Sequence, residues 1–227
     1  MTDALTGRPS RARTVGVAWL ALSALAIAVF APLRYLLNSV PDLAATGEEV
    51  ATHYAAQPGW AQTALVLHAG AGGLALLLSP VQLSARVRAR VPRVHRVVGR
   101  AALAAIAGAG AAGLVLASVS LAGAIGTAGF GTLALTWLTC AALGFRSILR
   151  GDVAAHRRWM IRTFALTYAG VTLRLWLIVL IPLLDGDFLR AYLFTSFLCW
   201  VPNLVVAELL LRRDASRSAA SGATVGT

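Results

Sequence analysis

The stretch WAQTALVLHAGAGGLALLLSPVQ (60–82) decides the fold class of this chain. It contains no Asp, Glu, Lys or Arg over its whole length. About 20 apolar residues in a helix are enough to cross the hydrocarbon core of a bilayer. The stretch therefore predicts a transmembrane helix.

Comparable apolar runs occur along most of the chain. We predict six membrane spans, at residues 15–37, 60–82, 97–120, 127–149, 160–184 and 188–211. The 227 residues are 58% hydrophobic and only 13% charged, whereas about a quarter of the residues of a soluble domain are charged. The expected fold is all-α, a polytopic bundle of six transmembrane helices. A basic segment (1–14) precedes this domain (15–211), and a disordered tail (212–227) rich in Ser, Ala and Gly follows it.

The charge distribution predicts the orientation. All 20 basic residues are Arg, and the net charge is +11. Seventeen of them fall on one side of a six-span arrangement: Arg8, Arg11, Arg13, Arg86, Arg88, Arg90, Arg93, Arg96, Arg100, Arg146, Arg150, Arg157, Arg158, Arg162, Arg212, Arg213 and Arg217. The opposite loops carry Asp42, Glu48, Glu49, Asp185 and Asp187, with Arg190 as their base.

This asymmetry follows the positive-inside rule and places both termini in the cytoplasm. It predicts a multi-pass protein of the plasma (cytoplasmic) membrane. The short Arg clusters are expected to contact anionic lipid heads of the bilayer rather than nucleic acid.

Ionisable groups inside a bilayer are costly, so they are the first candidates for function. His68 lies within the second span, followed on its own helical face by Gly72 and Ala75. It is either a binding residue or a histidine bonded to a neighbouring helix. The Ala- and Gly-rich third span, with Ala105, Ala109 and Gly113, either packs closely against other helices or makes room for a flat ligand.

Two further histidines lie near the inner surface. His95 begins the third span within HRVVGR (95–100), and His156 begins the fifth within HRRWMIR (156–162). Their similar depth allows a shared site, although each alone could bond lipid phosphates. His53 is expected to be an ordinary surface histidine in the outer loop, where EEVATHYA (48–55) predicts a short interfacial helix.

Arg174 is the least expected residue, well inside the fifth span at a depth near that of His68. No Asp or Glu occurs in the middle of a span, and Glu208 lies near the inner end of the sixth. A ligand anion or backbone carbonyls could therefore balance this guanidinium, unless it extends to the outer surface. Pro202 in the sixth span predicts a kink.

Three blocks resemble an uncharacterised bacterial membrane family, domain of unknown function 2306. They are LHAGAGGLALLLSPVQL (67–83), PRVHRVVGRA (92–101) and HRRWMIRTFALTYAGVTLRL (156–175). The resemblance covers about residues 60–210. It implies that His68, His95, His156 and Arg174 belong to the family's motif.

A more distant likeness is to cytochrome b561-type bundles, which hold two haems between four histidines. This chain offers three histidines for such a role, so at most one bis-histidine haem b would fit, with His95 and His156 as the depth-matched pair.

These features support several hypotheses, and whether the protein is an enzyme is left open. The first is a haem-binding or quinone-linked electron-transfer protein that uses His68, His95, His156 and Arg174 as cofactor-binding residues. The second is a small-solute transporter with Arg174 as the counter-charge. The third is an assembly or chaperone protein with an unknown protein partner. A metal hydrolase is the fourth, but the spans lack the acidic ligand cluster that such chemistry needs.

Overall fold

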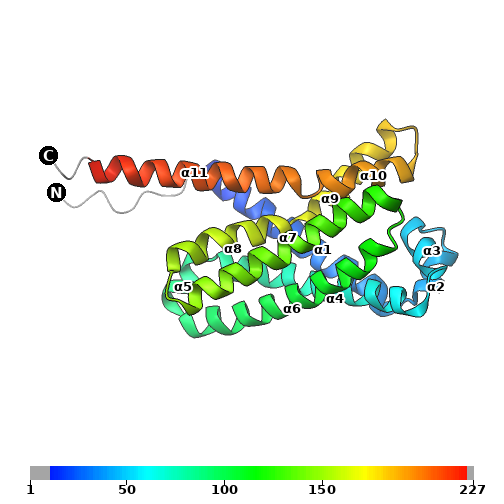
Figure 1. Cartoon of the computed structure of the whole chain (residues 1–227), viewed down its shortest axis with the longest axis horizontal. Helices are drawn as coiled ribbons and strands as arrows, with labels where there is room; N and C mark the ends of the chain where they lie inside the picture. Colours follow the sequence, from blue (N-terminus) through cyan, green and yellow to red (C-terminus); the bar gives the residue numbers. More distant parts are fainter. Residues whose placement is uncertain (1–10, 224–227) are drawn as a thin grey trace.

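The computed structural model describes residues 11–223 as a bundle of helices (Figure 1). Within these residues, six segments are long and apolar enough to cross a membrane. They are formed by α1 (Arg11–Leu37), α4 (Gly59–Leu83), α6 (Pro92–Ser118), α7 (Gly123–Leu149), α8 (Val153–Thr167) with α9 (Ala169–Leu183), and α10 (Phe188–Leu198) with α11 (Val201–Ala223). The prediction of an all-α six-span bundle is confirmed.

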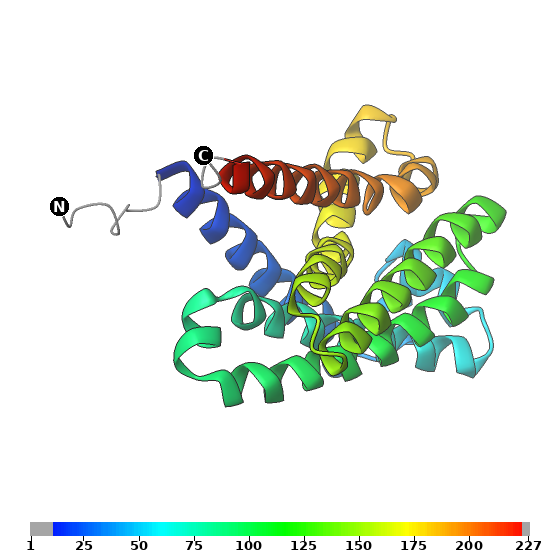
Figure 2. The same ribbon diagram turned by 60° about the vertical axis from the view of Figure 1, so that its left-hand side comes forward.

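Short helices mark the two ends of the bundle. At one end, α2 (Val40–Ala45) and α3 (Glu49–Ala55) form a segment that we call the cap (residues 40–55). At the opposite end, α5 (Ala85–Arg90) joins α4 to α6. Figures 1 and 2 show the beginning of α1 and the end of α11 near that second end. Which end faces the cytoplasm is still a prediction from the Arg distribution; we call the cap end the outer end.

The fifth span is divided at Tyr168, between α8 and α9. The hydroxyls of Thr163 and Thr167 donate to the carbonyls four residues earlier, at 2.9 and 2.8 Å. Such back-bonding bends helices because it competes for the carbonyls of the helical ladder. Trp137 of α7 donates its indole N–H to Thr167 Oγ1 at 2.9 Å, which ties α7 to this bend.

The sixth span is divided at Cys199 and Trp200, just before Pro202. Proline fits the first turn of a helix but interrupts a helix interior, so the chain begins a new helix there. Thr172 and Asn203 donate to the Cys199 carbonyl at 2.5 and 3.1 Å. The backbone oxygen at this break is therefore satisfied by side chains within the membrane.

Small residues set how closely the helices approach. Ala109 is fully buried between α6 and its neighbours, as expected for a close-packing helix. Gly73 of α4 lies against Pro32 of α1, where a Cβ on Gly73 would be only 2.2 Å from Pro32 Cγ. Gly113 lies beneath the His68 ring, with 3.3 Å between an added Cβ and Nδ1. The third span therefore packs closely and also makes room for a ring, that of His68.

The C-terminal segment differs from the sequence-based expectation. A disordered tail was expected from residue 212, whereas α11 continues as a helix to Ala223. Ser216 Oγ donates to the Arg212 carbonyl, and Arg157 pairs with Asp214 at 2.9 Å. Both contacts lie on the first turns of helix beyond the span. Residues 1–10 and 224–227 of the expected terminal segments lie outside the described residues.

Candidate functional site

A cavity of about 660 Å³ lies in the outer half of the bundle. It is bounded by α1, α4, α6, α7, α9 and α10, with the end of α8, and the cap contributes to its outer end. Its volume is within the range of small-molecule sites, and most of its lining is apolar. The charged and polar side chains that line it include Arg34, Glu48, Tyr54, His68, Arg174 and Tyr192.

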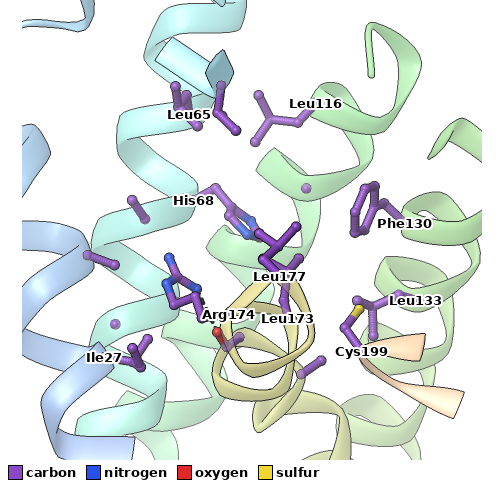
Figure 3. Close-up of a pocket in the computed structure, with 18 of the residues that line it drawn as sticks. Ile27, Leu65, His68, Leu116, Phe130, Leu133, Leu173, Arg174, Leu177 and Cys199 are labelled. Carbon is purple, nitrogen blue, oxygen red and sulfur yellow. Dashed lines mark hydrogen bonds between the residues drawn. The ribbon is translucent and has the colours of Figure 1, made fainter. Parts of the chain in front are cut away.

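His68 reaches this cavity from α4 (Figure 3). Its Nδ1 lies 2.9 Å from the Ala109 carbonyl of α6. A carbonyl only accepts, so Nδ1 carries the proton in this contact and Nε2 is left as an acceptor. With Gly113 beneath the ring, the imidazole is held in one orientation.

Arg174 enters the same cavity from α9 (Figure 3). One guanidinium nitrogen donates to the Gly170 carbonyl, one turn earlier on the same helix, at 2.6 Å. Arg174 takes part in none of the four ion pairs found in the described part of the chain. The guanidinium has five N–H donors, and a single carbonyl does not balance its charge.

Glu208 is not the partner of Arg174. It forms a bidentate ion pair with Arg162 of α8 near the inner end of the bundle. Arg162 Nε donates to Glu208 Oε1 at 2.5 Å, and Nη2 donates to Oε2 at 2.9 Å. The Arg162 guanidinium also lies 4.8 Å from the centre of the Trp159 ring. Glu208 is thus already engaged by Arg162.

We expect Glu208→Gln to lower the free energy of unfolding by about 1–2 kcal/mol. It removes the charge that balances Arg162, and the side chains of the pair are only 21% and 37% exposed. Thermal unfolding in detergent measures the change. Asp187→Asn is the matched control, because Arg190 and Asp187 form an exposed pair at 3.8 Å and should contribute almost nothing. Equal effects of the two substitutions would contradict this assignment.

A second arginine at the cavity was not anticipated from the sequence. Arg34, one turn from the outer end of α1, forms an ion pair with Glu48, the residue that precedes α3 in the cap. In the sequence, Arg34 lies close to Pro32 and to the acidic residues of the following loop, and this proximity could have indicated the ion pair. Glu49 also lines the cavity but is exposed on α3. Of the two arginines, Arg34 is paired and Arg174 is not.

The cap is fastened to the outer end of α6. The Tyr54 hydroxyl donates to the Leu116 carbonyl at 3.2 Å, and His53 Nε2 lies 2.8 Å from the Val119 carbonyl. Burial raises the pKa of Tyr54 to about 12, so its hydroxyl stays a donor near neutral pH. His53 is therefore half-buried, and its ring contacts the Val119 carbonyl at the end of α6. It is not the ordinary surface histidine expected from its position in the loop.

The two inner histidines lie apart from the cavity. His156 Nδ1 contacts the Gly144 carbonyl of α7 at 2.8 Å. His95 Nδ1 is buried without a hydrogen-bond partner among the described residues, and His156 lies within electrostatic range of it. Neither lines the cavity. The structure therefore brings together His68 and Arg174, and separately His95 and His156.

A bis-histidine haem does not fit the cavity. Such a haem needs two opposed imidazoles, and His68 is the one histidine of the described chain that lines this space. His95 and His156 lie in the first turns of α6 and α8, at the inner end of the bundle and away from the cavity.

Comparison with protein families gives a match over most of the membrane-crossing part of the chain. Residues 65–211 match the family described as "Predicted membrane protein (DUF2306)". The chain belongs to this family. The matched segment of the DUF2306 protein begins in α4 and ends in α11, so it contains His68, His95, His156 and Arg174. The cap and α1, with Arg34 and Glu48, precede it. Searches of curated proteins and of solved structures give no match.

Proposed function

We propose that this DUF2306 protein binds a small organic molecule with a negatively charged head in the cavity, and that Arg174 is its counter-charge. The observation that carries the proposal is the guanidinium of Arg174, which faces a mostly apolar cavity and forms no ion pair among the described side chains. Glu48, the acid within electrostatic range of it, is already paired with Arg34. An unbalanced charge inside a membrane is unfavourable, and an anion in the cavity removes that cost.

His68 selects the protonation state of the bound head. With its Nδ1 proton directed to Ala109, the ring presents Nε2 to the cavity as an acceptor. A head that both accepts from Arg174 and donates to His68 satisfies the two side chains together. A hydroxy acid or a monoprotonated phosphate has this pattern, and a simple carboxylate satisfies Arg174 alone.

A quinol is the second candidate ligand. A hydroxyl oxygen of the quinol could accept from Arg174 and a hydroxyl O–H could donate to His68 Nε2, which would give the site a role in electron transfer. A neutral quinol leaves the charge of Arg174 unbalanced, and this is why an anion is preferred here.

The test is to identify what the protein carries. The chain is purified in a mild non-ionic detergent, its bound organic molecules are extracted, and they are identified by mass spectrometry. We expect one organic acid at near-stoichiometric amount, reduced to background in Arg174→Gln. A quinone at the same amount in both proteins would overturn the proposal in favour of the redox function.

A visible absorption spectrum of the same preparation, oxidised and then dithionite-reduced, is recorded beside it. The anion proposal expects no Soret band. A Soret band with sharp α and β bands on reduction would instead establish a b-type haem, and His→Ala substitutions at positions 68, 95 and 156 would then locate its ligands.

A further inference from the structure

The inner halves of α1 and α9 are fastened together. The Ser23 hydroxyl of α1 lies 2.6 Å from the hydroxyl of Tyr168, at the beginning of α9. Around this contact, a buried cluster joins the two helices to α4; it comprises Ala24, Ala28, Leu76, Tyr168 and Val171. The cavity is therefore closed towards the inner surface along this side.

The outer halves of the same two helices are separated by the cavity. On α1, Ile27, Ala31 and Arg34 line it at spacings of four and three, which places them on one helical face. On α9, Leu173 and Leu177 line it on one face together with Arg174 (Figure 3). The two faces belong to the two walls of one space.

Two lining residues, one on each of these helices, keep large exposed fractions, as expected where the cavity opens at the surface of the bundle. Phe30 of α1 is 55% exposed, and Ile178 of α9 is 69% exposed. Both belong to membrane-crossing helices, so their exposed surface faces lipid. We call the gap between Phe30 and Ile178 the lateral opening.

The aqueous end of the cavity is covered by the cap. Glu48 and Tyr54 of the cap line the cavity, and both are fixed to the bundle, to Arg34 and to the Leu116 carbonyl respectively. An anion coming from water meets these contacts and the carboxylates of Glu48 and the exposed Glu49, which repel it. A ligand already in the bilayer meets only apolar side chains at the lateral opening.

We propose that the ligand is a membrane-resident, single-chain amphiphile with one negative charge, and that it enters through the lateral opening. Its head pairs with Arg174, which lies about 14 Å from the outer end of α9 at about 1.5 Å per residue, and its chain extends past Phe30 and Ile178 into lipid. This inference rests on the proposed function and adds the source and class of the ligand.

The test uses palmitate with a photoreactive diazirine near its chain end, and protein in phosphatidylcholine nanodiscs. Palmitate has the chain and the negative charge that pairs with Arg174 and lacks the group that donates to His68, so it tests the arginine and the route of entry. We expect light-induced labelling of peptides from α1 and α9. Excess palmitate should compete, whereas butyrate and hexadecanol should not, because they lack the chain and the charge respectively. Arg174→Gln should abolish the competable labelling.

The failures of the two proposals are distinguishable. If butyrate competes as well as palmitate and Arg174→Gln abolishes binding of both, the anion site stands and entry from the bilayer is wrong. If labelling is the same in wild-type protein and Arg174→Gln, the anion site itself is wrong.

A second experiment addresses the opening itself. We expect the double variant Phe30→Trp, Ile178→Trp to slow exchange of bound palmitate by about tenfold, because larger side chains narrow the gap. The matched control is Leu33→Trp, Val179→Trp, at positions 45% and 54% exposed on the same helices that do not line the cavity. Equal exchange rates in the two double variants would overturn entry at this position.

Discussion

Replacing Arg174 by Gln should weaken binding of the anionic ligand by roughly a hundredfold while the protein still folds. Removing one partner of a buried charge pair costs about 2–5 kcal/mol, and each 1.4 kcal/mol is about a factor of ten in affinity. Among the described residues, Arg174 donates its side-chain hydrogen bond to the Gly170 carbonyl of its own helix and joins no ion pair. Its replacement therefore removes little from the fold, and the loss should appear in binding.

The measurement is a titration of photoreactive palmitate labelling in nanodiscs, with the thermal unfolding temperature of each variant recorded beside it. Arg190→Gln is the matched control, because Arg190 lies at the outer end of α10, is 68% exposed and does not line the cavity. Arg174→Lys should retain part of the affinity, since it keeps the charge and loses the planar fork. An Arg174→Gln protein that binds normally, or a Lys variant no better than Gln, would contradict a charge-pairing role.

Replacing Gly73 by Ala should lower the free energy of unfolding by about 3 kcal/mol, near the upper end of overpacking effects. The new Cβ would lie 2.2 Å from Pro32 Cγ and 3.0 Å from the Ala28 carbonyl oxygen. Both are atoms of the chain's stiffest parts, a proline ring and a helix backbone, so neither can move aside without shifting α1.

The neighbouring Gly72 is the matched control. A Cβ there meets only Ala109 Cβ, at 3.9 Å, which is an ordinary contact. Gly72→Ala should therefore be close to neutral or slightly stabilising, since alanine is the better helix former. The measurement is the free energy of unfolding of both variants in the same detergent. Similar stability of the two would mean that α1 does not pack on α4 at Pro32.

Movement of α1 would also change the cavity. Ala31 and Arg34 of α1 line it beside Gly73, so a displaced α1 should alter the lateral opening and the Arg34–Glu48 pair together. Gly73→Ala protein that still folds should accordingly exchange palmitate at a changed rate.

Much of the architecture could be predicted from composition alone. Each predicted span falls on one of the six long apolar segments, because the free energy of placing a side chain in lipid depends mainly on that side chain. The helical outer loop was predicted in the same way from EEVATHYA, and α3 forms there. Pro202 marked the break of the sixth span, since proline cannot continue a helix ladder. The bend at Tyr168 was not predicted, because it arises from Thr hydroxyls that turn inward only in the packed bundle.

The candidate site, too, could be predicted from the sequence only in part. The sequence by itself determined that His68 and Arg174 are buried in the membrane, because both lie inside long apolar runs and no acid shares their depth. Their roles in binding remain predictions. Only the tertiary structure decided that they line one cavity, that Glu208 belongs to Arg162, and that Arg34 and the cap form the outer end. The reason is that helix rotation and spacing are set by contacts between distant segments, such as Gly73 against Pro32 and Gly113 beneath His68, and the order of residues within one helix does not contain them.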